Sequence, residues 1–133
     1  MPYIAKVATG KLPYLNVYGD DYKTKDGTGI RDYIHVVDLA KGYVAALKCY
    51  KNKKQNIFIY NLGTGNGTSV LDLVKAYEKA NDKKVKYKIV GRRVGDVDKL
   101  YCKPEKANRE LGWKAKLDIE SMCESSYRFE NKK

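Results

Sequence analysis

Residues 57–81 read IFIYNLGTGNGTSVLDLVKAYEKAN, an apolar run followed by a glycine-rich turn and a segment with helical periodicity. The run at 57–62 is apolar and β-prone, which is typical of a strand buried on both faces of a parallel sheet. Ser69 followed three residues later by Asp72 resembles a capping box, and apolar residues beyond it recur at helical spacing, so a helix is expected over 69–81. A buried strand that leads into a helix predicts an α/β fold.

The flanking sequence predicts further short strands and helices. Strands are expected at 15–18, 30–36 and 85–90. Helices are expected at 1–9, ended by Gly10, and at 38–50, 104–112 and 118–130. Asp38 is the expected N-cap of the second helix, whose apolar face would carry Leu39, Ala40, Tyr43 and Leu47. We expect a solvated turn at 51–55 and a long loop at 19–29, of a length that usually carries function or disorder.

The amino-acid composition limits the classes of protein to which this chain could belong. The 133 residues, 43% hydrophobic and 32% charged, suffice for one modest water-soluble domain. No apolar run approaches the roughly 18 residues that cross a bilayer, and no secretory signal is evident, so neither a membrane nor export is expected. Three cysteines without CxxC spacing favour reduced thiols in the cytoplasm and argue against a structural zinc site; they are Cys49, Cys102 and Cys123.

The net charge of +11 raises the question of nucleic acid binding. Most of the positive residues are dispersed lysines, whereas arginine is the usual choice for bidentate contacts with bases and phosphates. A lysine-biased, solvated surface explains the charge, so nucleic acid is not an expected partner.

The turn at 63–68 resembles an anion cradle, because glycine amides at the start of a helix can bind phosphate. A dinucleotide fingerprint needs glycine at the first, third and sixth positions, and the sixth position here is Thr68. No acidic residue ends a second strand at the required distance. We therefore interpret this segment as a tight turn and expect no NAD site in it.

Catalytic constellations are scarce in this sequence. A lone histidine such as His35 is more often a hydrogen-bonded structural residue than a general base. Tyr50 and Lys54 have Tyr-x-x-x-Lys spacing, but they straddle a helix end and a lysine-rich turn. No catalytic residue and no metal ligand is assigned.

Two segments place arginine beside glycine and aspartate, residues 29–32 (GIRD) and 92–96 (RRVGD). Guanidinium groups at loop–strand junctions could hold a diphosphate, and the carboxylate could accept from a ribose hydroxyl. Arginine at a strand end is as often part of a surface ion pair. The residues alone leave both readings open.

Several longer motifs resemble the UDP-glucose 4-epimerase family of extended short-chain dehydrogenases/reductases. They follow one another along the chain as MPY (1–3), NVYGDDY (16–22), DGTGIRDYIHV (26–36), YNLGTG (60–65), RRVGDV (92–97) and ELGW (110–113). The segment 26–35 is specific to the 4-epimerase branch and speaks against a related decarboxylase or 4,6-dehydratase. The resemblance extends over essentially the whole chain but covers only the C-terminal part of the family's length.

The resemblance implies a site for UDP-glucose and UDP-galactose, as in galactose metabolism. In the family, hydride passes from the sugar to NAD and then returns to the opposite face of the sugar. Between the two transfers the oxidised sugar rotates while the UDP stays tightly bound. By resemblance, Arg31 and Arg93 clamp the diphosphate and Asp96 holds the uridine ribose. By the same resemblance, Asn16 and Tyr18 border the uracil. Leu100 stands where relatives carry the residue that gates N-acetylated sugars, and its medium size leaves that specificity open.

The resemblance also implies what this chain lacks. The family's NAD loop, catalytic Ser and Tyr-x-x-x-Lys lie upstream of Met1, so the N-terminal Rossmann domain is absent from residues 1–133. The chain alone is expected to bind no cofactor, with NAD belonging to the complete enzyme, a cytoplasmic homodimer. The strand–helix unit at 57–81 would normally join the Rossmann sheet, so we expect low stability or self-association without it. The alternatives are a non-catalytic UDP-sugar-binding module and an inactive truncated product.

Overall fold

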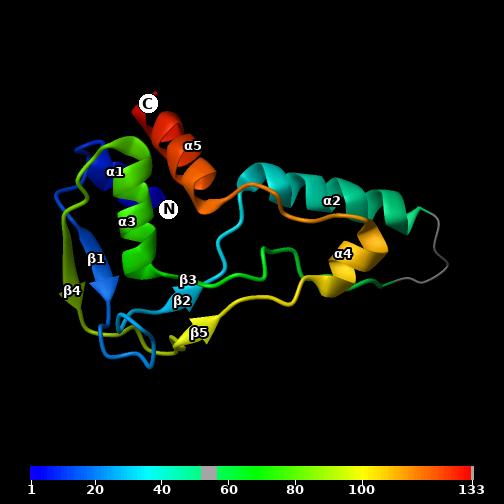
Figure 1. The fold of residues 1–133 in the computed structure, drawn as a ribbon, viewed down its shortest axis with the longest axis horizontal. Helices are drawn as coiled ribbons and strands as arrows, with labels where there is room; N and C mark the ends of the chain where they lie inside the picture. Colours follow the sequence, from blue (N-terminus) through cyan, green and yellow to red (C-terminus); the bar gives the residue numbers. More distant parts are fainter. Residues whose placement is uncertain (52–56, 133) are drawn as a thin grey trace.

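The computed structural model describes residues 1–51 and 57–132, which form ten helices and strands. One end holds α1 (Pro2–Ala8), β1 (Leu15–Tyr18), α3 (Val70–Asn81), β4 (Tyr87–Val90) and α5 (Ile119–Asn131), as Figure 1 shows. The other end is an arm with α2 (Val36–Tyr50) and α4 (Glu105–Leu111). Between them lie the short strands β2 (Ile30–Arg31), β3 (Thr68–Ser69) and β5 (Lys99–Leu100). The predicted α/β class is confirmed.

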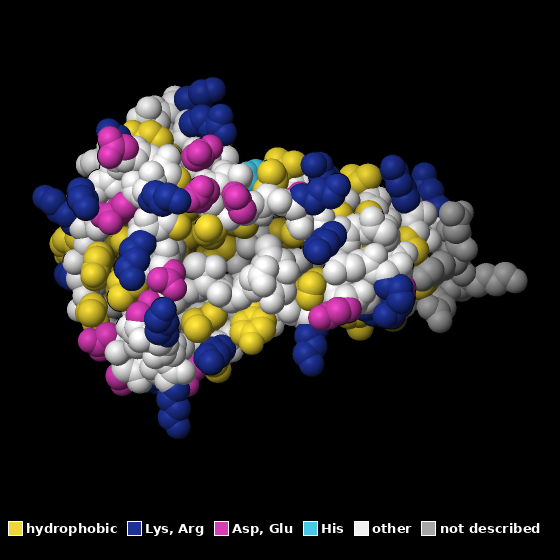
Figure 2. All heavy atoms as spheres, in the orientation of Figure 1, with side chains coloured by type: hydrophobic (Ala, Val, Ile, Leu, Met, Phe, Trp, Pro, Cys, Tyr) yellow, Lys and Arg dark blue, Asp and Glu magenta, His cyan; other side chains and the backbone are white. Residues whose placement is uncertain are grey.

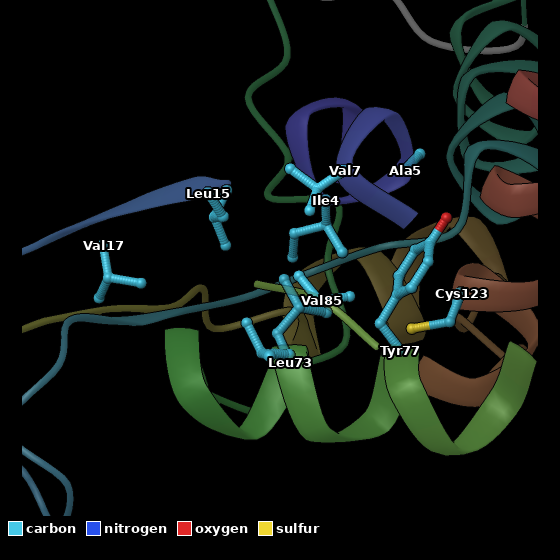
Figure 3. Packing of buried hydrophobic residues seen from close by; sticks show 10 residues of the cluster. Ile4, Ala5, Val7, Leu15, Val17, Leu73, Tyr77, Val85 and Cys123 are labelled. Carbon is cyan, nitrogen blue, oxygen red and sulfur yellow. The ribbon is translucent and has the colours of Figure 1, made fainter. Parts of the chain in front are cut away.

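The hydrophobic core lies at the first end, between α1, α3, α5 and the β1–β4 pair. β1 and β4 are parallel, with Leu15 opposite Tyr87 and Tyr18 opposite Val90. Figure 3 shows side chains from this core pointing toward one another, among them Ile4, Leu73 and Val85. Full burial of each such aliphatic side chain contributes about 1.5–3 kcal/mol, so this end carries most of the packing energy.

The second sheet has the order β3-β2-β5. β2 is antiparallel to β3 and parallel to β5, and each pairing has two residue pairs, with Arg31 opposite Thr68 on one side and Leu100 on the other. The predicted strand at 30–36 is therefore too long, because the chain leaves the sheet after Arg31 and enters α2 at Val36.

The predicted N-cap of α2 is also wrong. His35 is the N-cap, and its Nδ1 accepts from the backbone N–H of Val37 at 3.1 Å. Since Nδ1 accepts, the ring proton lies on Nε2 and is donated to Ser125 Oγ at 3.0 Å, which joins α2 to α5. The expectation of a structural, hydrogen-bonded His35 is confirmed. Asp38 instead lies buried in the first turn, where its Oδ2 accepts from the backbone N–H groups of residues 116 and 117, both at 2.7 Å.

The predicted buried strand at 57–62 is wrong for this structure. Within 1–51 and 57–132 no strand pairs with it, and Ile57 and Ile59 are 79% and 73% exposed. Its backbone lies beside α4 instead, where Lys106 Nζ donates to the carbonyl of Ile59 at 2.9 Å. Most of the turn expected at 51–55 lies outside the described residues.

The apolar face of α2 is likewise uncovered in this structure. Tyr43 and Leu47, which were expected on that face, are 60% and 65% exposed. The packed face of α2 is a different one: a Cβ on Gly42 would lie 2.9 Å from Leu62 Cδ1 and 3.1 Å from Trp113 Cε2. Close packing at Gly42, together with the hydrogen bonds of His35 and Asp38, therefore holds α2 to the rest of the chain.

The remaining helices agree with expectation. Ser69 caps α3 and accepts from the N–H of Asp72 at 3.1 Å, and Gly112 ends α4 with φ of 60°. Asp118 caps α5. All three cysteines are free thiols. In the described part of the chain, no helix combines the length and the apolar character needed to span a membrane.

Candidate functional site

A hollow of about 720 Å³ lies between α1, β1, the 19–29 loop, the start of α3 and the turn at 93–96. Five tyrosines line it: Tyr3, Tyr14, Tyr18, Tyr22 and Tyr33. Its polar side chains include Asn16, Arg31, Arg93 and Asp96. The hollow thus combines aromatic surface with two guanidinium groups and one carboxylate, a lining suited to an aromatic anion.

Asp96 lies between the two guanidinium groups. Arg31 Nη2 is 3.4 Å from Asp96 Oδ1, and Arg93 Nε is 3.3 Å from Asp96 Oδ2. Arg31 and Asp96 are half-buried, with side chains 27% and 25% exposed, whereas that of Arg93 is 63% exposed. Two cations against one anion leave the group with a net charge of +1.

The backbone near each arginine explains this placement. Arg31 Nη1 donates to the carbonyl oxygens of Ile30 and Val97 at 2.8 and 3.0 Å, which fixes its guanidinium between β2 and the segment leading to β5. Gly95 has φ of 85°, a conformation that glycine adopts without strain. It lets the chain fold back so that the N–H of Asp96 reaches the carbonyl of Arg93 at 3.3 Å.

Strand β1 presents Asn16 and Tyr18 on one face. Residues alternate along a strand, and here Leu15 and Val17 are buried while Asn16 and Tyr18 are exposed. The Arg93 guanidinium lies 4.4 Å from the centre of the Tyr18 ring, within cation–π distance. The sequence-predicted residues from β1 and from the 93–96 turn therefore meet in the same hollow.

Leu100 is the one predicted site residue outside this hollow. It is 63% exposed and lies opposite Arg31 in the parallel β2–β5 pairing. A second hollow of about 580 Å³ contains it, together with Arg31, Asp32 and residues near 61–63 and 101–103. Arg31 belongs to both hollows, so the two are neighbours.

Sequence reasoning missed the residues that hold the 19–29 loop beside the site. Arg92 Nε donates to Asp21 Oδ1 at 2.6 Å, and its guanidinium lies 4.0 Å from the Tyr22 ring centre. A Cβ on Gly19 would lie 2.7 Å from Tyr22 Cε2, so glycine is needed there. Arg92 stands next to Arg93 in the same motif, but nothing in the spacing distinguishes the arginine that pins the loop from the one that lines the hollow.

The other end of the loop is tied to the start of α3. Asp26 accepts from Ser69 Oγ at 2.5 Å and from the N–H and hydroxyl of the fully buried Thr28 at 3.0 and 2.8 Å. Burial opposes ionisation of Asp26, but the bonds from Ser69 and Thr28 outweigh it and hold the pKa of this carboxyl below its usual value. The loop is therefore a fixed wall of the hollow.

The glycine-rich turn at 63–68 does not face the hollow. The N–H groups of Thr64 and Gly65 both donate to the carboxylate of Asp32 at 3.0 Å. A carboxylate of the chain itself thus occupies the amides that a dinucleotide phosphate would need, and the turn does not fit NAD.

The fold and these motifs define the C-terminal part of an extended short-chain dehydrogenase/reductase. Residues 1–126 match the protein family described as GDP-mannose 4,6 dehydratase, and the chain belongs to that family.

Within this group, the sequence is similar to UDP-glucose 4-epimerases. It is 58% identical over 123 residues to UDP-glucose 4-epimerase 2 of Arabidopsis thaliana, covering 92% of this chain and 35% of that protein. The chain therefore spans about a third of the length of the curated relatives it matches.

Two solved structures support the same assignment. UDP-glucose 4-epimerase from Bifidobacterium longum, in complex with NAD+ and UDP, is 55% identical with a TM-score of 0.93, covering 98% of this chain and 38% of that one. The Stenotrophomonas maltophila enzyme, with bound NAD and formylated UDP-arabinopyranose, is 46% identical with a TM-score of 0.94, covering 98% of this chain and 39% of that one.

Proposed function

We propose that this chain is the UDP-sugar-gripping part of a UDP-glucose/UDP-galactose 4-epimerase, an isomerase of galactose metabolism. The observation that carries the proposal is the meeting of Arg31, Arg93 and Asp96 with Asn16 and Tyr18 in one hollow of about 720 Å³. That volume falls within the range of small-molecule sites. UDP bound to the similar Bifidobacterium enzyme supports the same ligand here.

Each residue then has a role set by its chemistry. Arg31 and Arg93 bind the diphosphate, since guanidinium groups form paired, charge-assisted bonds with phosphate oxygens. Asp96 accepts from a ribose hydroxyl, and the Asn16 amide and the Tyr18 ring bound the uracil. Leu100, beside Arg31 in the second hollow, stands at the position that gates N-acetylated sugars, and its medium size leaves that specificity open.

The redox step belongs to an N-terminal, NAD-binding half that completes the enzyme. The glycine-rich turn of this chain does not fit the cofactor because its amides bind Asp32. We therefore expect the chain alone to be inactive and the complete enzyme to act as a cytoplasmic homodimer. An assay of the chain alone, then with an added NAD-binding half, separates this proposal from a non-catalytic UDP-sugar-binding module: activity in the second assay favours the enzyme.

Titration of UDP into the chain tests the proposed grip. Charge-assisted hydrogen bonds contribute about 1.5–3 kcal/mol each, so Arg31→Ala and Arg93→Ala should each weaken UDP binding at least about tenfold. Arg109→Ala is the matched control, because Arg109 lies at the end of α4 and pairs with Glu110 at 3.5 Å. An unchanged affinity for UDP in Arg31→Ala refutes the assignment.

A further inference from the structure

We propose that Asp32 is a positioning residue of the diphosphate site: its carboxylate ties β2, β5 and the 63–66 turn together and so keeps Arg31 opposite Asp96. The inference rests on the proposed function. It adds a residue that contacts neither uracil, ribose nor diphosphate in that proposal.

The carboxylate of Asp32 accepts hydrogen bonds from two separate segments. Oδ1 accepts from the N–H and hydroxyl of Thr64 at 3.0 and 2.5 Å. Oδ2 accepts from the N–H of Gly65 at 3.0 Å and from the N–H of Cys102 at 3.4 Å. The backbone N–H of Asp32 also donates to the carbonyl of Leu100 at 3.2 Å. One side chain thus joins the end of β2 to the turn and to the residues after β5.

These bonds matter because the sheet itself is minimal. β2 pairs with β5 through two residue pairs, so the ladder gives little resistance to separation of the strands. Near one end of the segment 96–102, Arg31 Nη1 donates to the carbonyl of Val97 at 3.0 Å, and at the other end the Asp32 carboxylate accepts from the N–H of Cys102. Between them, the backbone N–H groups of Ile30 and Asp32 donate to the carbonyls of Asp98 and Leu100 at 2.9 and 3.2 Å. Asp96 begins this segment, so the 3.4 Å Arg31–Asp96 contact depends on how the segment as a whole is attached to β2.

The backbone at Gly63 packs closely against the carboxylate. A Cβ on Gly63 would lie 2.6 Å from Asp32 Oδ2 and 2.4 Å from Cys102 Sγ. Burial opposes ionisation of Asp32, but the donors on Thr64, Gly65 and Cys102 outweigh it and hold the pKa of the carboxyl below its usual value. At neutral pH the side chain is therefore a fixed, charged acceptor.

The geometry favours an indirect role over ligand binding. Both Asp32 oxygens already accept from the chain, and Asp32 lines the second hollow and not the one with Asn16, Tyr18 and Arg93. A negative charge would also repel a diphosphate. Asp32 therefore acts through Arg31 and the segment that carries Asp96.

The test compares UDP with free uracil, because the ribose of a nucleoside would also contact Asp96. In Asp32→Asn one carboxylate oxygen becomes an amide NH₂ group, which cannot accept a hydrogen bond. This group must face either the N–H groups of Gly65 and Cys102 or the donors of Thr64, so one set of bonds is lost and the attachment loosens. NMR shift titrations should show UDP affinity reduced at least about tenfold and uracil affinity unchanged, because Asn16 and Tyr18, which bound the uracil in the proposal, lie on β1 in the other sheet. Asp82→Asn removes the same charge at the left-handed C-cap of α3, where asparagine is tolerated, and should change neither affinity.

Each result decides between the hypotheses. If wild type binds UDP and Asp32→Asn binds it equally well, the positioning role is wrong while the proposed function stands. Equal losses for UDP and uracil indicate general destabilisation and also overturn the positioning role. Failure of the wild-type chain to bind UDP refutes both. Should Asp32→Asn not fold, Thr64→Val removes one hydroxyl donor and keeps the backbone bonds; it should weaken UDP binding about threefold, again without changing uracil affinity.

Discussion

At the scale of single residues, the arrangement around Asp96 balances attraction against selectivity. Arg31 and Arg93 attract any anion of the right size. The carboxylate between them repels anions, and only a ligand whose hydroxyl group donates a hydrogen bond to it offsets that repulsion. In the proposed binding mode, a nucleoside diphosphate brings ribose hydroxyls to that carboxylate, whereas inorganic pyrophosphate does not. Specificity of this kind comes from an element that disfavours the wrong ligand.

We therefore expect Asp96→Asn to change the affinities for UDP and for pyrophosphate in opposite directions. Pyrophosphate should bind several-fold more tightly because a repelling charge is gone. The ratio of UDP affinity to pyrophosphate affinity should fall at least about tenfold. Calorimetric titrations at low ionic strength measure both affinities, with Asp82→Asn as the charge-matched control. A parallel rise for both ligands would show that Asp96 does not contact the ribose.

At the scale of elements, the start of α2 shows how a buried carboxylate replaces regular pairing. Asp38 is 1% exposed and joins α2 to the segment between α4 and α5 through the N–H groups of Lys116 and Leu117. Trp113 Nε1 donates to the carbonyl of the same residue at 3.0 Å. Burial opposes ionisation, but the bonds from Leu117 and Lys116 outweigh it, and the pKa of Asp38 lies below its usual value.

This depressed pKa predicts how Asp38 stabilises the fold as pH changes. A carboxyl whose pKa is lower in the folded state contributes stability above its unfolded pKa, near about 3.9, and loses it as pH falls through the folded value. Asp38→Asn should therefore cost about 2 kcal/mol at pH 7, with the difference from wild type shrinking below about pH 4. Urea unfolding at several pH values measures this difference. A gap that stays constant down to pH 2 would contradict the linkage.

At the scale of the whole molecule, the chain leaves apolar surface uncovered. Val44, Leu47 and Ile57 are 51%, 65% and 79% exposed, and a hollow of about 810 Å³ runs along α2 beside α4. In Figure 2, lysine and arginine side chains are scattered over the visible face, and apolar side chains reach the surface over α2 between them. Exposed apolar surface of this kind usually marks an interface. The proposed N-terminal half is the partner that would cover it.

Without that partner we expect self-association. Sedimentation velocity should show a weight-average mass that rises with concentration, and the melting temperature should rise with it. Leu47→Lys should reduce the association, whereas Val94→Lys, at an exposed position on the 93–96 turn, should not. A sharp, concentration-independent melt of a monomer would contradict this expectation.

Helices whose start and end signals lie within a few residues could be predicted from the sequence alone. The cap at Ser69, the glycine at 112 and the cap at Asp118 act within a few residues, so α3, α4 and α5 were predicted close to their observed bounds. The site residues were named through resemblance to a family, because arginine beside glycine and aspartate equally fits a surface ion pair.

Features that depend on residues far apart in the sequence follow from the tertiary packing. Asp38 became a buried acceptor because residues 116 and 117 reach it, which left the capping of α2 to His35. Residues 57–62 are β-prone, yet a strand exists only where another strand pairs with it, and in the described chain none does. Arg31 and Asp96 meet across 65 positions because β5 lies beside β2, a contact that long-range packing sets and that neighbouring residues cannot encode.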